Sequence, residues 1–77
     1  MANIYQVSPE SLHIDTDQSE RDIRTQMKRL EAEGQIEPIP VKPDMSLDRN
    51  HPDFWHYADA QVIAAIRLNW DTILVTY

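Results

Sequence analysis

The residues best placed to do chemistry in this chain form the run Ala58-Asp59-Ala60-Gln61, at the expected start of a helix. A carboxylate in a first helical turn can act as a general acid or base or bind a metal ion, and the free N–H groups there attract anions. The plainer role is that Asp59 complements the helix dipole or caps the helix, and we expect that role. We therefore predict no catalytic residue and no metal ligand.

Other polar groups lack the spacing of a recognised site. The loop between Asp44 and Asp53 contains three aspartates (Asp48 is the third) and His51, but it has no glycine such as a calcium-binding loop needs, so we expect a solvated loop. His56 lies on an expected strand, so we interpret its closeness to the helix start as chance. The chain has no cysteine, which excludes thiolate zinc sites, disulfides and a cysteine nucleophile. No cofactor is predicted.

Aromatic and basic side chains are the candidate partner-binding residues. Aromatic residues often anchor protein interfaces, but a core this small needs them for packing as well. We expect Trp70 to pack in the core, and we assign Trp55 and Tyr57 to an interaction surface together with Arg24 and Lys28. Four basic residues of the first expected helix can form a basic face, although interleaved acidic residues favour an ordinary solvated face: Arg21, Arg24, Lys28 and Arg29.

Charge and length narrow the functional classes. The 77 residues carry 13 acidic and 7 basic side chains, a net charge of −6 at pH 7. An acidic surface repels phosphate backbones, so direct nucleic-acid binding is disfavoured; the charge can also serve only solubility. No apolar run approaches the roughly 20 residues needed to cross a membrane. The N-terminus lacks the pattern of a secretory signal. We expect a cytoplasmic protein with no membrane partner.

The first expected helix covers residues 19–33 and begins with a serine that can cap it. Ile23, Met27 and Leu30 follow at intervals of four and three, which places them on one narrow apolar stripe. Gly34 is the single glycine of the chain and stands where a helix often ends in a left-handed conformation. This segment carries the clearest local signals in the sequence.

The remaining elements follow from apolar patterns and turn residues. Residues 58–68 predict a second helix, and Asn69 can end it because asparagine tolerates a left-handed conformation. Pro38 and Pro40 lack backbone donors, so their strand should expose an edge or bulge. The expected order is β-α-β-β-α-β, with two helices packed on a small mixed sheet whose strands cover residues 4–7, 36–43, 54–57 and 72–77.

Three segments, in this order, resemble the N-terminal domain of ParB-type proteins, whose fold is shared with sulfiredoxin. They are the opening strand and turn IYQVSPESL (residues 4–12), the segment GQIEPIPVKP (34–43) and the segment WHYADAQVIAAIRLNWDTILV (55–75). The resemblance covers essentially the whole chain. It implies one ParB/sulfiredoxin-like domain of the α/β (α+β) class over residues 1–77.

In that family, cationic residues at the start of the second helix hold a nucleoside triphosphate. This chain has Ala58 where the family has glycine, and Ala60 and Gln61 where it has the cationic residues, while Asp59 keeps an acidic residue. The resemblance therefore implies a vestigial nucleotide site at these four positions. The helix-turn-helix and dimerisation regions of partition proteins are also missing from the expected domain, and the lack of cysteine excludes sulfiredoxin chemistry.

We expect a small, acidic, non-catalytic interaction or regulatory module that binds a protein partner. Its size, charge and degenerate motif are similar to those of accessory proteins of phages and mobile elements that modulate a host macromolecule. The alternative is a ParB-like domain that handles nucleotides or DNA weakly through residual phosphate binding. A third hypothesis is an enzyme of the family's kinase or nuclease type that uses Asp59. The small core and an exposed proline-bearing strand also favour a homodimer.

Overall fold

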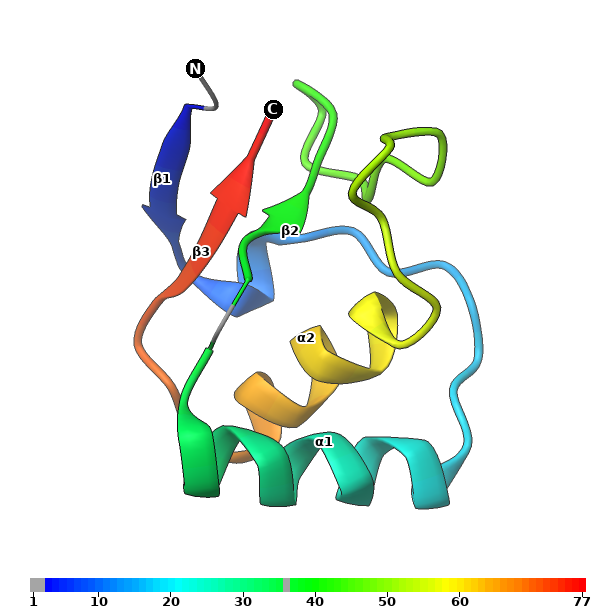
Figure 1. Cartoon of the computed structure of the whole chain (residues 1–77), viewed down its shortest axis with the longest axis vertical. Helices are drawn as coiled ribbons and strands as arrows, with labels where there is room; N and C mark the ends of the chain where they lie inside the picture. Colours follow the sequence, from blue (N-terminus) through cyan, green and yellow to red (C-terminus); the bar gives the residue numbers. More distant parts are fainter. Residues whose placement is uncertain (1–2, 36) are drawn as a thin grey trace.

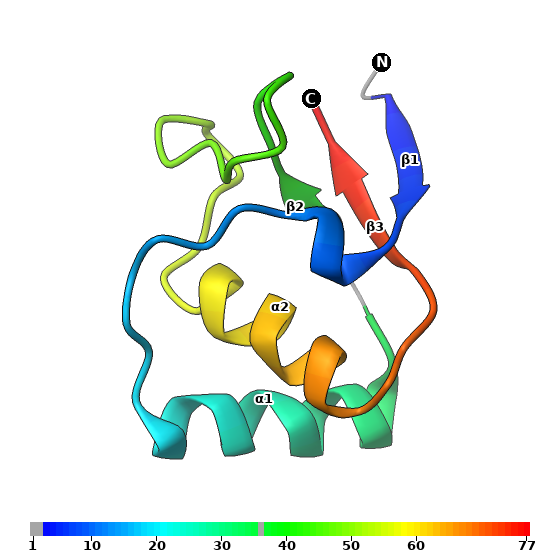
Figure 2. The same cartoon turned by 180° about the vertical axis from the view of Figure 1, so that it is seen from behind.

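Three short strands form a mixed sheet in the order β1-β3-β2, and two helices pack below it (Figure 1). The computed structural model describes residues 3–35 and 37–77. The strands are β1 (Ile4–Val7), β2 (Ile39–Pro40) and β3 (Ile73–Thr76). Both views of the ribbon show α2 lying between α1 and the sheet (Figures 1 and 2). The fold is therefore α+β, with two helices packed on a small mixed sheet, and this part of the prediction from the sequence is confirmed.

The last strand, β3, is the centre of the sheet. It pairs antiparallel with β1, from Ile4 opposite Thr76 to Val7 opposite Ile73. On its other side it pairs parallel with β2, where Ile39 lies opposite Val75. The strand β2 is at the edge, as its prolines predict, but it is shorter than residues 36–43, and Ile36 lies outside the described residues.

A glutamine side chain takes the place of a strand where β2 is missing. The Gln35 amide accepts a hydrogen bond from the Leu74 N–H at 2.7 Å and donates one to the Leu74 carbonyl at 2.8 Å. Both backbone groups of Leu74 are therefore satisfied although no strand lies beside Leu74 on the side of β2, which matters because an unpaired buried backbone group is costly.

Helix α1 (Glu20–Glu33) begins and ends where the sequence predicts. The Ser19 hydroxyl accepts a hydrogen bond from the Asp22 N–H at 3.1 Å. Gly34 ends the helix at φ +72°, and its N–H donates to the Leu30 carbonyl at 2.9 Å. The apolar stripe is buried at Ile23 and Leu30, where it faces α2 and the core.

Helix α2 (Ala58–Arg67) occupies the middle of the molecule because its alanines allow close packing. Ala58, Ala60, Ala64 and Ala65 are fully buried. Asn69 follows the helix with φ +59°, as predicted. Within the described chain, no helix is both long and apolar enough to cross a membrane.

The predicted strand at residues 54–57 is wrong. These residues form a turn that leads into α2: the Phe54 N–H bonds to the His51 carbonyl at 3.0 Å, and the Ala58 N–H bonds to the Trp55 carbonyl at 3.2 Å. The described residues thus contain three strands in a sheet instead of the four that we expected. Phe54 and Trp55 pack against the core from this turn, whereas His56 and Tyr57 are exposed, so the aromatic pattern does not reflect pairing in a sheet.

Candidate functional site

Asp59, the acidic residue singled out in the sequence, is a buried structural ion-pair partner. It lies in the first turn of α2 and is 1% exposed. Its Oδ2 atom accepts a hydrogen bond from the Thr16 hydroxyl at 2.6 Å and one from Arg49 Nη2 at 2.5 Å. The Arg49 guanidinium also lies 5.5 Å from the centre of the Phe54 ring. Asp59 therefore joins α2 to the loop before α1 and to the loop before α2.

This arrangement gives Asp59 little access to a substrate. The guanidinium and the hydroxyl share one carboxylate oxygen, while the other, Oδ1, is buried without a hydrogen-bond partner. No group of three or more candidate metal ligands occurs among the residues that the structure describes. The role of Asp59 in this geometry is structural: its hydrogen bonds hold two loops against α2.

The other residues of the predicted vestigial site divide into two groups. Ala58 and Ala60 are fully buried with Asp59, so their side chains lie below the surface. Gln61 is half-buried and lines a pocket. Its Nε2 donates to Oε1 of Gln26 at 3.3 Å, and its own Oε1 is buried without a partner. Gln61 is thus the member of the set that reaches a hollow in the surface.

Two adjoining pockets run along α1 and share Arg29, and we call them together the α1 groove. One has a volume of about 290 Å³ and is lined by Arg21, Asp22, Thr25, Gln26, Arg29 and Tyr57. The other has a volume of about 250 Å³ and is lined by Arg29, Glu33, Gly34, Glu37, Trp55 and Gln61. Gln26 is 2% exposed, so its amide lies at the base of the groove.

The structure brings Trp55 and Tyr57 together with basic residues, but these are Arg21 and Arg29 instead of the predicted Arg24 and Lys28. Tyr57 is 41% exposed, and Trp55 is partly buried beside the core. Arg21 and Arg29 are eight residues apart on α1 and so lie on the same side of the helix. Arg24 and Lys28 are four residues apart and share a face equally well, so spacing in the sequence alone does not select Arg21 and Arg29.

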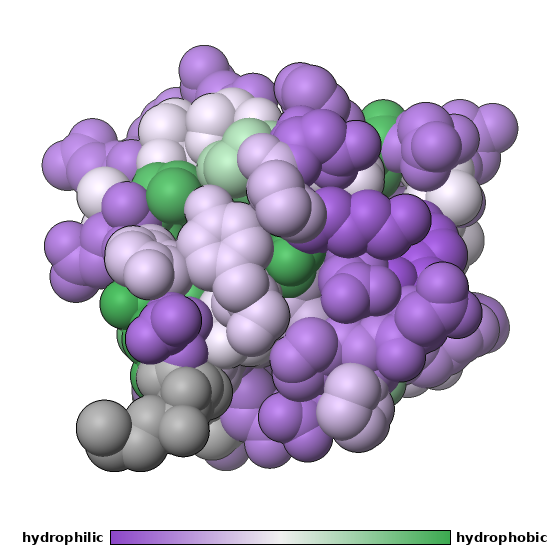
Figure 3. All heavy atoms as spheres, turned by 90° about the horizontal axis from the view of Figure 1, so that it is seen from above, coloured by the Kyte–Doolittle hydropathy of each residue, from purple (hydrophilic) through white to green (hydrophobic). Residues whose placement is uncertain are grey.

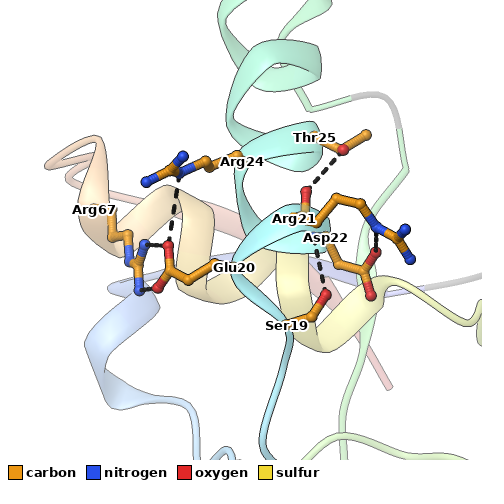
Figure 4. Close-up of polar contacts among 7 residues, drawn as sticks. All are labelled: Ser19, Glu20, Arg21, Asp22, Arg24, Thr25 and Arg67. Carbon is orange, nitrogen blue, oxygen red and sulfur yellow. Dashed lines mark hydrogen bonds and ion pairs between the residues drawn. The ribbon is translucent and has the colours of Figure 1, made fainter.

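Arg24 belongs to a different surface, on which α1 meets the end of α2 (Figure 4). Its Nε lies 3.8 Å from Glu20, and Glu20 forms two hydrogen bonds with Arg67, at 2.5 and 2.8 Å. The hydrogen bond from Arg67 lowers the pKa of Glu20, and Glu20 in turn raises the pKa of Arg67. Lys28 is exposed and lines neither pocket of the groove.

The acidic loop before α2 uses its polar side chains for turns. Asp44 Oδ1 accepts hydrogen bonds from the Ser46 hydroxyl and N–H at 2.6 and 2.9 Å, and these bonds lower the pKa of Asp44. Asp48 accepts from the Asn50 N–H at 3.1 Å, and His51 Nδ1 accepts from the Asp53 N–H at 3.0 Å. These local bonds are typical of a solvated loop.

Comparisons of the chain with protein-family models, with curated proteins and with solved structures found no match in any of the three.

Proposed function

We propose that this protein is a non-catalytic interaction module whose α1 groove binds an extended segment of a partner protein. The observation that carries the proposal is the position of Arg29, which lines both pockets and has Trp55 in one and Tyr57 in the other. Arginine, tryptophan and tyrosine are the residue types that contribute most to binding free energy in protein interfaces. Because Arg29 of α1 lies beside Trp55 and Tyr57 from the turn before α2, the α1 groove has the composition most typical of a binding surface in the described chain.

The dimensions of the groove favour a peptide over a larger small molecule. Clefts that enclose drug-sized ligands usually have volumes of about 300–1,000 Å³. Each pocket here is smaller, at about 250 and 290 Å³, and the two adjoin. Two neighbouring hollows of this size suit two side chains of one extended segment.

The charges along the groove indicate the chemistry of that segment. Two arginines and one aspartate line one pocket (Arg21, Arg29 and Asp22), whereas two glutamates join the shared Arg29 in the other (Glu33 and Glu37). A matching segment carries an acidic residue that contacts the arginines and a basic residue that contacts the glutamates. The net charge of −6 further favours a partner that is basic as a whole.

Kinship with ParB-type domains is part of this proposal. The succession of α1, Gly34 and β2 supports it, because it matches the helix, glycine and proline-containing strand that the resemblance implies. The turn at residues 54–57 counts against it, because the resemblance implies a strand there. The proposed binding role depends on the groove and not on the kinship.

A displayed library of random peptides tests the proposal directly. We expect selection on the purified protein to enrich peptides with a shared acidic position. We expect Arg29→Glu to weaken their binding by on the order of tenfold or more, because a charged hydrogen bond contributes about 1.5–3 kcal/mol. Arg24→Glu is the matched control, since it changes the same residue type on the same helix outside the groove. No enrichment, or equal loss in both variants, would refute the proposal.

A second candidate is weak nucleotide binding in the pocket that contains Trp55, Arg29 and Gln61. An indole can stack on a base, a guanidinium can bind a phosphate, and an amide can pair with a base edge. This hypothesis predicts that ATP or CTP with Mg²⁺ raises the melting temperature and that Gln61→Ala or Arg29→Ala abolishes the increase. Asp59→Ala is a poor probe of this site because it removes a buried ion pair.

A further inference from the structure

We propose that the open edge of β1 is a homodimer interface, at which a second copy of this chain adds its own β1 in antiparallel orientation. The two three-stranded sheets would then form one continuous sheet across a two-fold axis. This surface is separate from the α1 groove, so the two proposals stand or fall independently.

The β1 edge is the free edge of the described sheet. In the order β1-β3-β2, β1 pairs with β3 alone. The opposite edge is partly covered, because the Asp48 N–H bonds to the Pro40 carbonyl at 2.9 Å and Val41 forms a bridge with Leu47. The proline-bearing strand, from which the sequence suggested a dimer, is therefore the less accessible edge.

Apolar side chains are exposed along β1 and next to it. Ile4 is 54% exposed, Tyr5 is 46% exposed, and Tyr77 is 48% exposed. The Tyr5 and Tyr77 rings meet edge to face with their centres 5.2 Å apart. Figure 3 views the end of the molecule that carries both termini, and its pale and green side chains gather on the side of β1 and β3. Apolar patches of this kind commonly mark interaction sites.

The distribution of charge identifies the occupant as a second copy. The chain carries a net charge of −6, yet residues 3–9 include no acidic, basic or histidine side chain. Two copies can therefore meet at this edge without placing like charges opposite each other, whereas a partner attracted by charge would find nothing to pair with. The strand also lacks the lysines, prolines and bulges that normally protect an exposed edge from pairing.

Sedimentation equilibrium on the untagged chain tests this interface. We expect a dimer whose affinity increases with salt, because salt screens the repulsion between two acidic chains. Tyr5→Lys should weaken the dimer by on the order of tenfold or more, since it puts two like charges into the interface. Tyr57→Lys should leave it unchanged, because Tyr57 is exposed to a similar extent but lies in the α1 groove.

Pyrene labelling locates the contact. The chain has no cysteine, so Gln6→Cys introduces a unique labelling position at the middle of the edge, and Glu31→Cys introduces one on the exposed part of α1. We expect excimer fluorescence from the label at position 6 and none from the label at position 31. A chain that stays monomeric at all concentrations overturns the proposal. So does a dimer that Tyr5→Lys leaves intact, or one with excimer fluorescence only at position 31.

Discussion

The ion pair between Arg49 and Asp59 predicts an unequal response to the loss of each partner. The Asp59 side chain is 2% exposed, whereas the Arg49 side chain is 45% exposed. Arg49→Ala leaves a buried carboxylate whose remaining hydrogen bond comes from Thr16. Asp59→Asn instead leaves a guanidinium that water can solvate, and the amide oxygen can still accept a hydrogen bond.

The magnitudes follow from this difference in burial. An uncompensated buried charge costs about 3–5 kcal/mol, and the exposure of Arg49 places the loss for Arg49→Ala near the lower limit, at about 3 kcal/mol. Weakening a charged hydrogen bond costs about 1.5 kcal/mol, which is the loss expected for Asp59→Asn. The double variant should be more stable than Arg49→Ala alone, because it no longer buries an unpaired charge.

Urea unfolding followed by tryptophan fluorescence measures all three free energies, with Trp55 and Trp70 as the reporters. Arg21→Ala is the control: Arg21 is exposed and its closest acidic partner, Asp22, is 4.0 Å away, so its loss should change stability by less than about 0.5 kcal/mol. The reasoning is refuted if Asp59→Asn destabilises the protein as much as Arg49→Ala, or if the double variant is the least stable.

Three further predictions test local features of the fold. Gln35→Ala should lower the free energy of unfolding by about 1–3 kcal/mol and speed amide hydrogen exchange at Leu74, because the backbone groups of Leu74 lose their hydrogen-bond partner. Unchanged exchange would contradict the proposal that Gln35 replaces a strand there. Arg67→Ala should raise the pKa of Glu20 toward 4.5 in an NMR titration. Because the ion pair lowers the pKa of Glu20 in the folded state, it stabilises the fold above pH 4.5, and this stabilisation disappears as the pH falls through the pKa of Glu20 in the folded protein. Gly34→Ala should destabilise the fold by about 1–3 kcal/mol and so lower its melting temperature, because Gly34 lies at φ +72° and ψ −173°, a region that essentially only glycine adopts, while the added methyl group meets no atom within 4 Å; Gly34→Asn should lower the melting temperature by a similar amount.

The helices could be predicted because their signals are local. Ser19 caps α1, and a residue with positive φ follows the end of each helix, Gly34 after α1 and Asn69 after α2, so a few neighbouring residues determine each boundary. The first and last strands of the chain, β1 and β3, also appear where the β-branched and aromatic residues indicate. The segment of residues 54–57 has the same composition but turns into α2, because partners distant in the sequence decide whether an aromatic segment pairs in a sheet.

The candidate site was harder to predict than the helices, because tertiary packing decides which side chains come together in it. A sequence pattern selects the helical face that carries a basic residue, but the loop that packs against that face comes from elsewhere in the chain. Trp55 and Tyr57 happen to lie against the face of Arg29 rather than that of Arg24. The burial of Gln26 was equally hidden, since a glutamine beside an apolar stripe is ordinarily exposed.

The antiparallel pairing of the first and last strands has a practical consequence for engineering. Ile4 lies opposite Thr76, so the chain enters and leaves the fold at nearly the same point (Figure 1). A domain with this geometry can be inserted into a surface loop of another protein, or circularly permuted through a short linker, with little distortion of either. An affinity tag at either end, by contrast, would crowd the Tyr5 side of the sheet.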